Sequence, residues 1–193
     1  TYFKDSEEIT TKGETKADIQ SKYFITSKDV TYRHDKKIIS SNHKTKLQDQ
    51  KSQVYFTDRF NYSINQEIIK GENFLIITNY NLPKSDKFFL DNAIINLKEN
   101  KFIAKNTKIE IHKDVFDNSD NDPRIEGVSS SGNKDYTLIN KGIFTSCKKK
   151  DGCPPWLITA KKITHDKDKK QLIYKDAILK VYNIPILYFP KFF

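Results

Sequence analysis

Short runs of alternating apolar and polar residues fill most of the chain, and polar turns separate one run from the next. The clearest run is Lys108-Ile109-Glu110-Ile111, in which every second side chain is apolar, as in a strand with one dry face. β-Branched and aromatic residues dominate the apolar positions, which favours strands over helices. The pattern predicts an all-β chain with strands over residues 22–33, 37–47, 52–64, 67–79, 86–97, 101–112, 124–130, 135–144, 155–165, 171–182 and 185–189.

Both ends of the chain depart from this pattern. Residues 1–20 are polar and show no periodicity, so we expect a flexible lead-in or an edge strand there. Residues 184–193 are strongly apolar and contain Pro185 and Pro190, which are incompatible with a helix interior or a central strand. This segment is either the last edge strand or a junction to a larger, membrane-embedded part. The chain starts with Thr1 and has no Met, so we expect it to be a piece of a longer protein.

Three stretches of the chain share one pattern. Residues 35–47, 99–111 and 169–181 each begin with a charged turn, followed by two apolar residues, a Lys/Ser-Asn/Asp-type corner and an alternating strand. Another strand precedes each copy. Such units cannot bury an apolar face alone, so they predict stacked strand repeats with an apolar interior and open edges. An ordinary antiparallel sandwich with chance likeness between hairpins is the alternative that the periodicity leaves open.

Charge changes the picture of the surface. The net charge is +9, but only Arg33, Arg59 and Arg124 are arginines, and the lysines are mixed with acids, as in residues 166–170. Nucleic-acid sites usually depend on arginine for bidentate contacts. We therefore expect solvated turns and strand faces, or attraction for anionic partners such as phosphorylated glycolipid heads. The rival hypothesis is a secreted or periplasmic β-domain that binds anionic polymer or nucleic acid through its lysines.

Residues able to carry chemistry are few. Cys147 and Cys153 are the two cysteines, and a structural disulfide, to each other or to cysteines elsewhere, is favoured over zinc, redox catalysis or free thiols. The histidines are scattered among turns and strand ends, which does not predict a metal site. No nucleophile elbow or glycine-rich phosphate loop occurs, so we expect neither an enzyme nor a cofactor.

Specific motifs gather in the C-terminal half. They are the stretches over residues 121–128 (NDPRIEGV), 144–147 (FTSC), 153–160 (CPPWLITA), 162–166, 174–182 and 184–193. Together they resemble the lipopolysaccharide-assembly protein family LptD (OstA/Imp), in the N-terminal periplasmic region that precedes its barrel. Residues 22–112 resemble the OstA-like repeats of that family in pattern only.

The resemblance implies a fold and a function. The fold would be an elongated, open-ended, twisted β-jellyroll (β-taco, OstA-like) over residues 21–183, with residues 184–193 as the junction to an outer-membrane β-barrel. Such a domain lies in the periplasm, receives lipopolysaccharide from the bridge protein LptA by edge pairing of strands, and passes it to a barrel held with the plug lipoprotein LptE. The family also forms disulfides between N-terminal cysteines and cysteines near the end of the barrel.

An acyl-binding groove would need an apolar inner face. We expect its lining from positions on alternating strands, and plain core packing is the alternative for the same residues. The expected lining residues are Ile95, Leu97, Phe102, Ile109, Ile111, Ile163, Leu179 and Val181.

Overall fold

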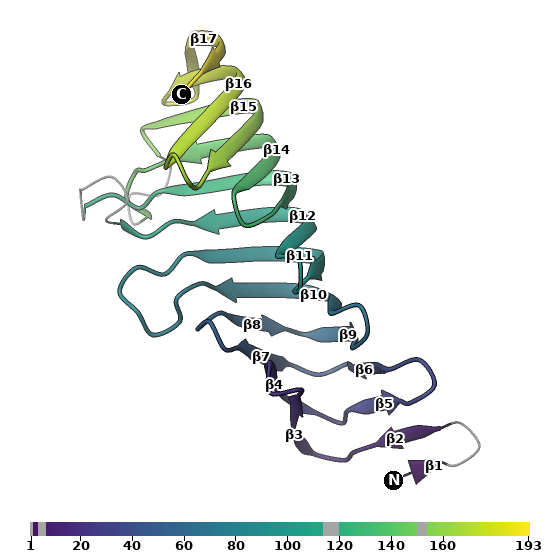
Figure 1. Cartoon of the computed structure of the whole chain (residues 1–193). Helices are drawn as coiled ribbons and strands as arrows, with labels where there is room; N and C mark the ends of the chain where they lie inside the picture. Colours follow the sequence, from purple (N-terminus) through teal and green to yellow (C-terminus); the bar gives the residue numbers. More distant parts are fainter. Residues whose placement is uncertain (1, 4–6, 114–119, 150–153) are drawn as a thin grey trace.

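The computed structural model describes residues 2–3, 7–113, 120–149 and 154–193 and contains one long antiparallel sheet. Figure 1 shows its strands stacked like the rungs of a ladder, with the two chain termini at opposite ends. The described residues form 17 strands: β1 (Tyr2–Phe3), β2 (Glu8–Thr10), β3 (Glu14–Ile19), β4 (Tyr23–Lys28), β5 (Thr31–Arg33), β6 (Ile38–Ser41), β7 (Thr45–Asp49), β8 (Val54–Thr57), β9 (Arg59–Ser63), β10 (Ile68–Ile77), β11 (Lys87–Asn96), β12 (Lys101–Glu110), β13 (Arg124–Gly132), β14 (Tyr136–Thr145), β15 (Trp156–Asp166), β16 (Gln171–Val181) and β17 (Ile184–Phe192).

A bend in every long strand divides the sheet into two arms. In the N-terminal half the bent strand is split in two, so β9 pairs with residues 68–72 of β10 and β8 pairs with residues 75–77. The first arm contains β2, β5, β6, β9 and residues 68–72, 92–96, 101–105, 129–132, 136–140, 162–166 and 171–175. The second arm contains β3, β4, β7, β8 and residues 74–77, 87–90, 107–110, 124–126, 143–145, 156–160 and 177–181.

The corner between the arms has its own chemistry. Asn73, Asn106 and Asp176 adopt positive φ angles of 53°, 46° and 51°, which asparagine and aspartate tolerate better than most residues. Corner side chains also bond across strands: the Asn73 amide donates to Asp58 and the Asn106 amide to Asp91, both at 2.8 Å. The corner residue reverses the alternation, so that side chains on both halves of one strand point into the same interior.

The inner faces of the two arms pack on each other. The rings of Tyr23 in the second arm and Tyr62 in the first arm lie 6.2 Å apart, edge to face. Phe88 and Phe102 make the same kind of contact at 6.5 Å. The cross-section is therefore a V, and we call the side where the hairpin turns of the two arms face each other the mouth.

Size complementarity closes the vertex of the V. At β10 the first arm has Gly71 where the second arm has Phe74, and a Cβ at Gly71 would lie 2.9 Å from the Phe74 ring. Further along the sheet the order is reversed. A Cβ at Gly142, in the second arm, would lie 2.5 Å from Cδ1 of Ile163, in the first arm. Large side chains thus alternate with small ones across the corner, as dense packing requires.

The predicted strands and fold class are confirmed. Each predicted strand corresponds to a strand of the structure or to a bent pair of short strands, and the single open sheet excludes the two-sheet sandwich. The predicted corners fall at Asn106 and Asp176 in the second and third repeats, where β12 and β16 run through them without a break. The first 20 residues contribute β1, β2 and β3 at the N-terminal end of the sheet, where β1 pairs with β2 and β3 pairs with β4.

Candidate functional site

The space between the arms is the candidate site. Two apolar clusters line it, an N-terminal one centred on β4–β12 and a C-terminal one on β12–β16, and Phe88 packs against both. No helix long and apolar enough to cross a membrane occurs in the part of the chain that the structure describes. Because Phe88 joins the two clusters, the interior is a continuous apolar strip between the two arms of the sheet.

All eight predicted lining residues face this interior. Ile95, Leu97, Ile109, Ile111 and Ile163 are buried, and Phe102, Leu179 and Val181 are half-buried. Both arms contribute, because residues before and after the corner point inward. Their contact with a lipid stays a prediction. Sequence reasoning missed Phe88 and Leu90, because the adjacent Phe89 points outward and hides the alternation in a continuous apolar run.

Two cavities lie along the interior. One of about 520 Å³ lies between the first strands, lined by apolar residues that include Ile19, Val30 and Ile39. A second of about 260 Å³ lies in the middle of the molecule, between Tyr55, Ile76 and Phe88 of the second arm and Ile95 and Phe102 of the first. Because turn residues such as Asn100 and Asn133 also line it, this cavity reaches the mouth.

One contact closes the mouth between the two cavities. Lys22 Nζ lies 2.8 Å from Glu67 Oε1, and the Tyr23 hydroxyl donates to Glu67 Oε2 at 3.1 Å. Lys22 and Tyr23 belong to the second arm, whereas Glu67 lies in a turn of the first. The hydrogen bond from Lys22 lowers the pKa of Glu67, and burial raises that of Tyr23. We call these three residues the clasp.

The mouth of the middle cavity has a cationic rim. Lys101, Lys134 and Lys167 come from successive turns of the first arm. Lys167 Nζ donates to the carbonyl oxygen of Asn133 at 2.9 Å, and burial lowers the pKa of this ammonium group. Burial also lowers the pKa of His165, two residues earlier on the inner face. The partial loss of water applies to Lys167, because Lys101 and Lys134 are exposed and pair with Glu99 and Asp135.

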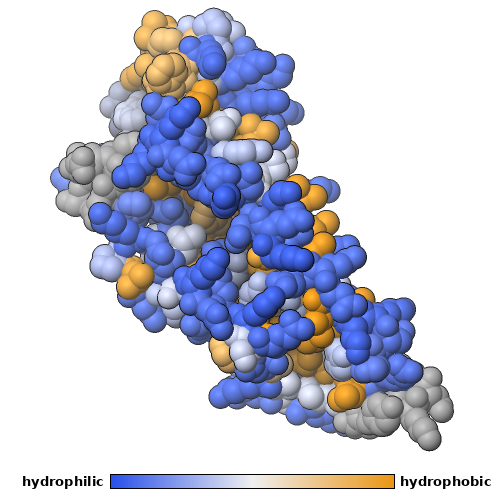
Figure 2. Space-filling model, in the orientation of Figure 1, coloured by the Kyte–Doolittle hydropathy of each residue, from blue (hydrophilic) through white to orange (hydrophobic). Residues whose placement is uncertain are grey.

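Aromatic rings fill the C-terminal end of the interior. Tyr174 stacks on Phe192 with ring centroids 4.5 Å apart, and Phe189 lies 5.0 Å from Phe192. Beyond them, β17 is an edge strand whose other side chains are mostly exposed. Figure 2 shows the resulting apolar surface at the β17 end. The exposed large residues of this end are Tyr182, Ile184, Ile186, Leu187, Tyr188 and Phe193.

The structure describes one of the two cysteines of the predicted disulfide. Cys147 is half-buried, and its thiol lies 3.7 Å from the carbonyl oxygen of Trp156. Cys153 lies outside the described residues, so the pairing stays a prediction. No group of three or more His, Cys, Asp or Glu side chains able to hold a metal occurs in the described segments. His43 and His112 instead pair with Asp29 and Asp86.

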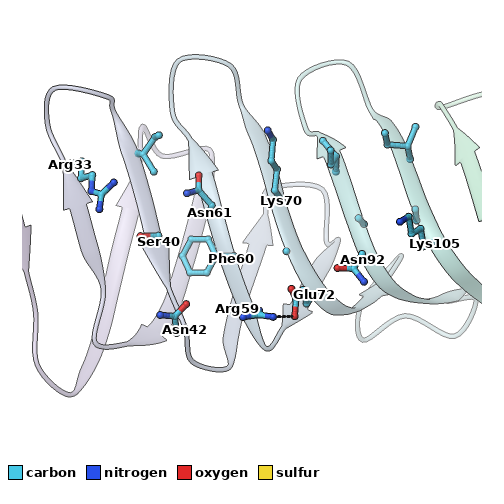
Figure 3. Close-up of a pocket in the computed structure, with 16 residues that line it drawn as sticks. Arg33, Ser40, Asn42, Arg59, Phe60, Asn61, Lys70, Glu72, Asn92 and Lys105 are labelled. Atoms are coloured by element: carbon cyan, nitrogen blue, oxygen red, sulfur yellow. Dashed lines mark ion pairs between the residues drawn. The ribbon is translucent and has the colours of Figure 1, made fainter.

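Another hollow, separate from the two interior cavities, lies on the outer face of the first arm. It has a volume of about 700 Å³ and crosses β5, β6, β9, β10, β11 and β12. Figure 3 shows its polar lining, which rises from one strand after another. We call this hollow the outer trough. Its lining residues are Arg33, Ile38, Ser40, Asn42, Arg59, Phe60, Asn61, Lys70, Gly71, Glu72, Asn92, Ala93, Ile94, Ile103, Ala104 and Lys105.

Comparison with known proteins finds a sequence similarity over about half of the chain. No protein-family model matches the chain. It is 27% identical over 114 residues to the LPS-assembly protein LptD of Polaromonas sp. (strain JS666), a match that covers 52% of this chain and 14% of that protein. That relative is named as an assembly protein for LPS. The chain is thus similar to LptD in sequence, and its open all-β sheet is compatible with an OstA-like domain.

Proposed function

We propose that this chain is the periplasmic domain of an outer-membrane lipopolysaccharide translocon. It receives lipopolysaccharide from the bridge protein LptA, shields the acyl chains between its arms, and passes the lipid to the barrel for insertion into the outer leaflet. The observation that carries the proposal is the apolar interior, which retains two unfilled cavities between the arms. The sequence similarity to LptD supports it.

The physics of acyl transfer requires shielding and no chemical step. Each CH₂ group costs about 0.8 kcal/mol in water, so an acyl chain needs an apolar surface along its whole path. The buried rows from Ile39 to Ile163 supply such a surface on successive strands. Direction of transport comes from an energy source elsewhere, since the interior offers only binding.

Edge pairing would bring the bridge protein to the N-terminal end. Within the described residues, β3 pairs only with β4, so one side of this six-residue strand offers free backbone groups. An unpaired edge accepts a strand from a neighbouring sheet by β-augmentation. We assign this edge to LptA. The opposite edge is β17, which coincides with the proposed junction over residues 184–193, and we assign it to the side of the barrel with LptE.

Site-specific photo-crosslinking in cells tests the proposal. A benzophenone side chain at Phe102, which lines the middle cavity, is expected to capture lipopolysaccharide. The matched control is Lys108, which alternates with the buried Ile109 and points outward on the same strand. Equal capture at both positions, or capture at Lys108 alone, would overturn the inner groove as the lipid path.

A further inference from the structure

The outer trough has no part in the proposed acyl path, because its polar side chains face away from the interior. Lys70, Asn92 and Lys105 are exposed, and they alternate along their strands with the buried Ile69, Ala93 and Ala104. The trough is therefore a separate surface of the wall.

Unused polar groups concentrate in the trough. Asn61 lies directly opposite Lys70 across two strands, and Asn92 lies directly opposite Lys105. In the part of the chain that the structure describes, none of these four side chains makes a hydrogen bond or ion pair. Two amides and two ammonium groups thus remain available to a ligand.

The charge of the trough is positive. Its ionisable lining consists of Arg33, Arg59, Lys70 and Lys105 and the carboxylate of Glu72. Arg59 pairs with Glu72 and Arg33 with Glu8 outside the trough, so the uncompensated charges are those of Lys70 and Lys105. These two arginines are also two of only three in the chain. A concave surface with such an excess favours an anionic ligand.

Shape and apolar content narrow the ligand class. The lining follows the strands at their spacing of about 4.8 Å, so a linear ligand can cross the strands and meet one side chain after another. Ile94 and Ile103 face each other across β11 and β12 and are 39% and 56% exposed, which forms a small apolar platform beside the amides. The amides can bind sugar hydroxyls, the ammonium groups can bind acidic groups, and the apolar platform can contact the C–H faces of sugar rings. Together these groups match an acidic sugar chain.

The aromatic content argues against nucleic acid. Binding of single strands relies on exposed aromatic side chains that stack on bases. Phe60 is the aromatic residue that lines the trough, and it is only 4% exposed. We propose that the outer trough binds an acidic saccharide through Asn61, Lys70, Asn92 and Lys105. The saccharide carries phosphate or carboxylate groups, and its binding requires no acyl chain in the interior.

Calorimetric titration with a hexamer of galacturonic acid tests this proposal, with the neutral maltohexaose as the ligand control. The double variant Lys70→Ala/Lys105→Ala is expected to weaken binding at least tenfold. The matched control is Lys162→Ala/Lys175→Ala, which removes the same charge from exposed positions of the same outer face. This control is expected to change the affinity less than twofold. Equal losses in the two double variants would mean diffuse charge attraction and would overturn the site.

Two further measurements separate the sugar site from its rivals. Asn61→Ala/Asn92→Ala leaves the charge unchanged and is expected to weaken binding at least threefold, whereas an unchanged affinity contradicts recognition of hydroxyl groups. A thymidine dodecamer that binds tighter than the hexasaccharide, with the same loss in Lys70→Ala/Lys105→Ala, would assign the trough to nucleic acid instead. Circular dichroism confirms that each variant is folded. Because no acyl chain is involved, these results are independent of the photo-crosslinking at Phe102.

Discussion

At the scale of single residues, the vertex of the V depends on glycines, which leave room for large side chains or backbone of the neighbouring strand. Gly71 lies where a Cβ would sit 2.5 Å from the backbone carbonyl oxygen of Arg59. At Gly142 the nearest atom is instead Cδ1 of Ile163, the end of a flexible side chain. Backbone cannot yield as a side chain can, so the two glycines have unequal tolerance for a methyl group.

Alanine substitutions at these positions measure the difference. We expect Gly71→Ala to lower the free energy of unfolding by about 1–3 kcal/mol, because the added methyl group overpacks the corner against backbone. Gly142→Ala is expected to cost less, because it meets only side-chain atoms of Ile163, which can shift more easily than backbone, and because the unfolded chain loses entropy. Urea titration of both variants gives the comparison, and an equal or larger loss in Gly142→Ala would contradict this view of the vertex.

At the scale of elements, the two arms are held together by packing inside and by the clasp at the mouth. Lys22 lies in the turn between β3 and β4 of the second arm, and Tyr23 is the first residue of β4. Glu67 lies in the turn before β10 of the first arm. A lipid that moves from the N-terminal cavity to the middle cavity, with its sugars outside the mouth, must pass this contact. The clasp must therefore open during each passage if the proposed path is correct.

Locking the clasp tests that requirement. In a background with Cys147→Ser and Cys153→Ser, the pair Lys22→Cys/Glu67→Cys can be joined by a short bifunctional maleimide. We expect lipid capture by a benzophenone at Phe102 to fall at least fivefold, while capture at Ile39, in the N-terminal cavity, persists. Each single cysteine treated with the same reagent is the control. Unchanged capture at Phe102 in the locked protein would show that the lipid does not pass the clasp.

Local patterns predicted the elements, and long-range packing decided the rest. Alternation places Ile109 and Ile163 on an inner face without any structure, because strand geometry fixes side-chain direction. The corner at Asn106 was visible as a polar break within a repeat. The clasp was not visible, since Lys22 and Glu67 are ordinary charged turn residues until the fold brings them together. The outer trough likewise depends on register, which places Asn61 beside Lys70 and is set by hairpin turns rather than by composition.

At the scale of the whole molecule, one outward row of side chains crosses the sheet from β9 to β17. Each member lies directly opposite the next, and the row becomes purely cationic at its C-terminal end. The row is Arg59, Glu72, Asn92, Lys105, Ser129, Asn140, Lys162, Lys175 and Lys191. Like charges in direct register destabilise a sheet, so this end of the molecule carries an unfavourable electrostatic energy when it is alone.

Reversing the central charge of this end should relieve the repulsion. Lys175 has Lys162 opposite it on one side and Lys191 on the other, and no ion pair involves these three among the described residues. We expect Lys175→Glu to raise the free energy of unfolding by about 0.5–1 kcal/mol in low salt, because two repulsive cross-strand pairs become attractive. Denaturation in 1 M NaCl should remove most of this gain, since the screening length is then only about 3 Å. A gain that persists in high salt would trace to packing or strand propensity, and an absent gain in low salt would show that solvent already screens the row.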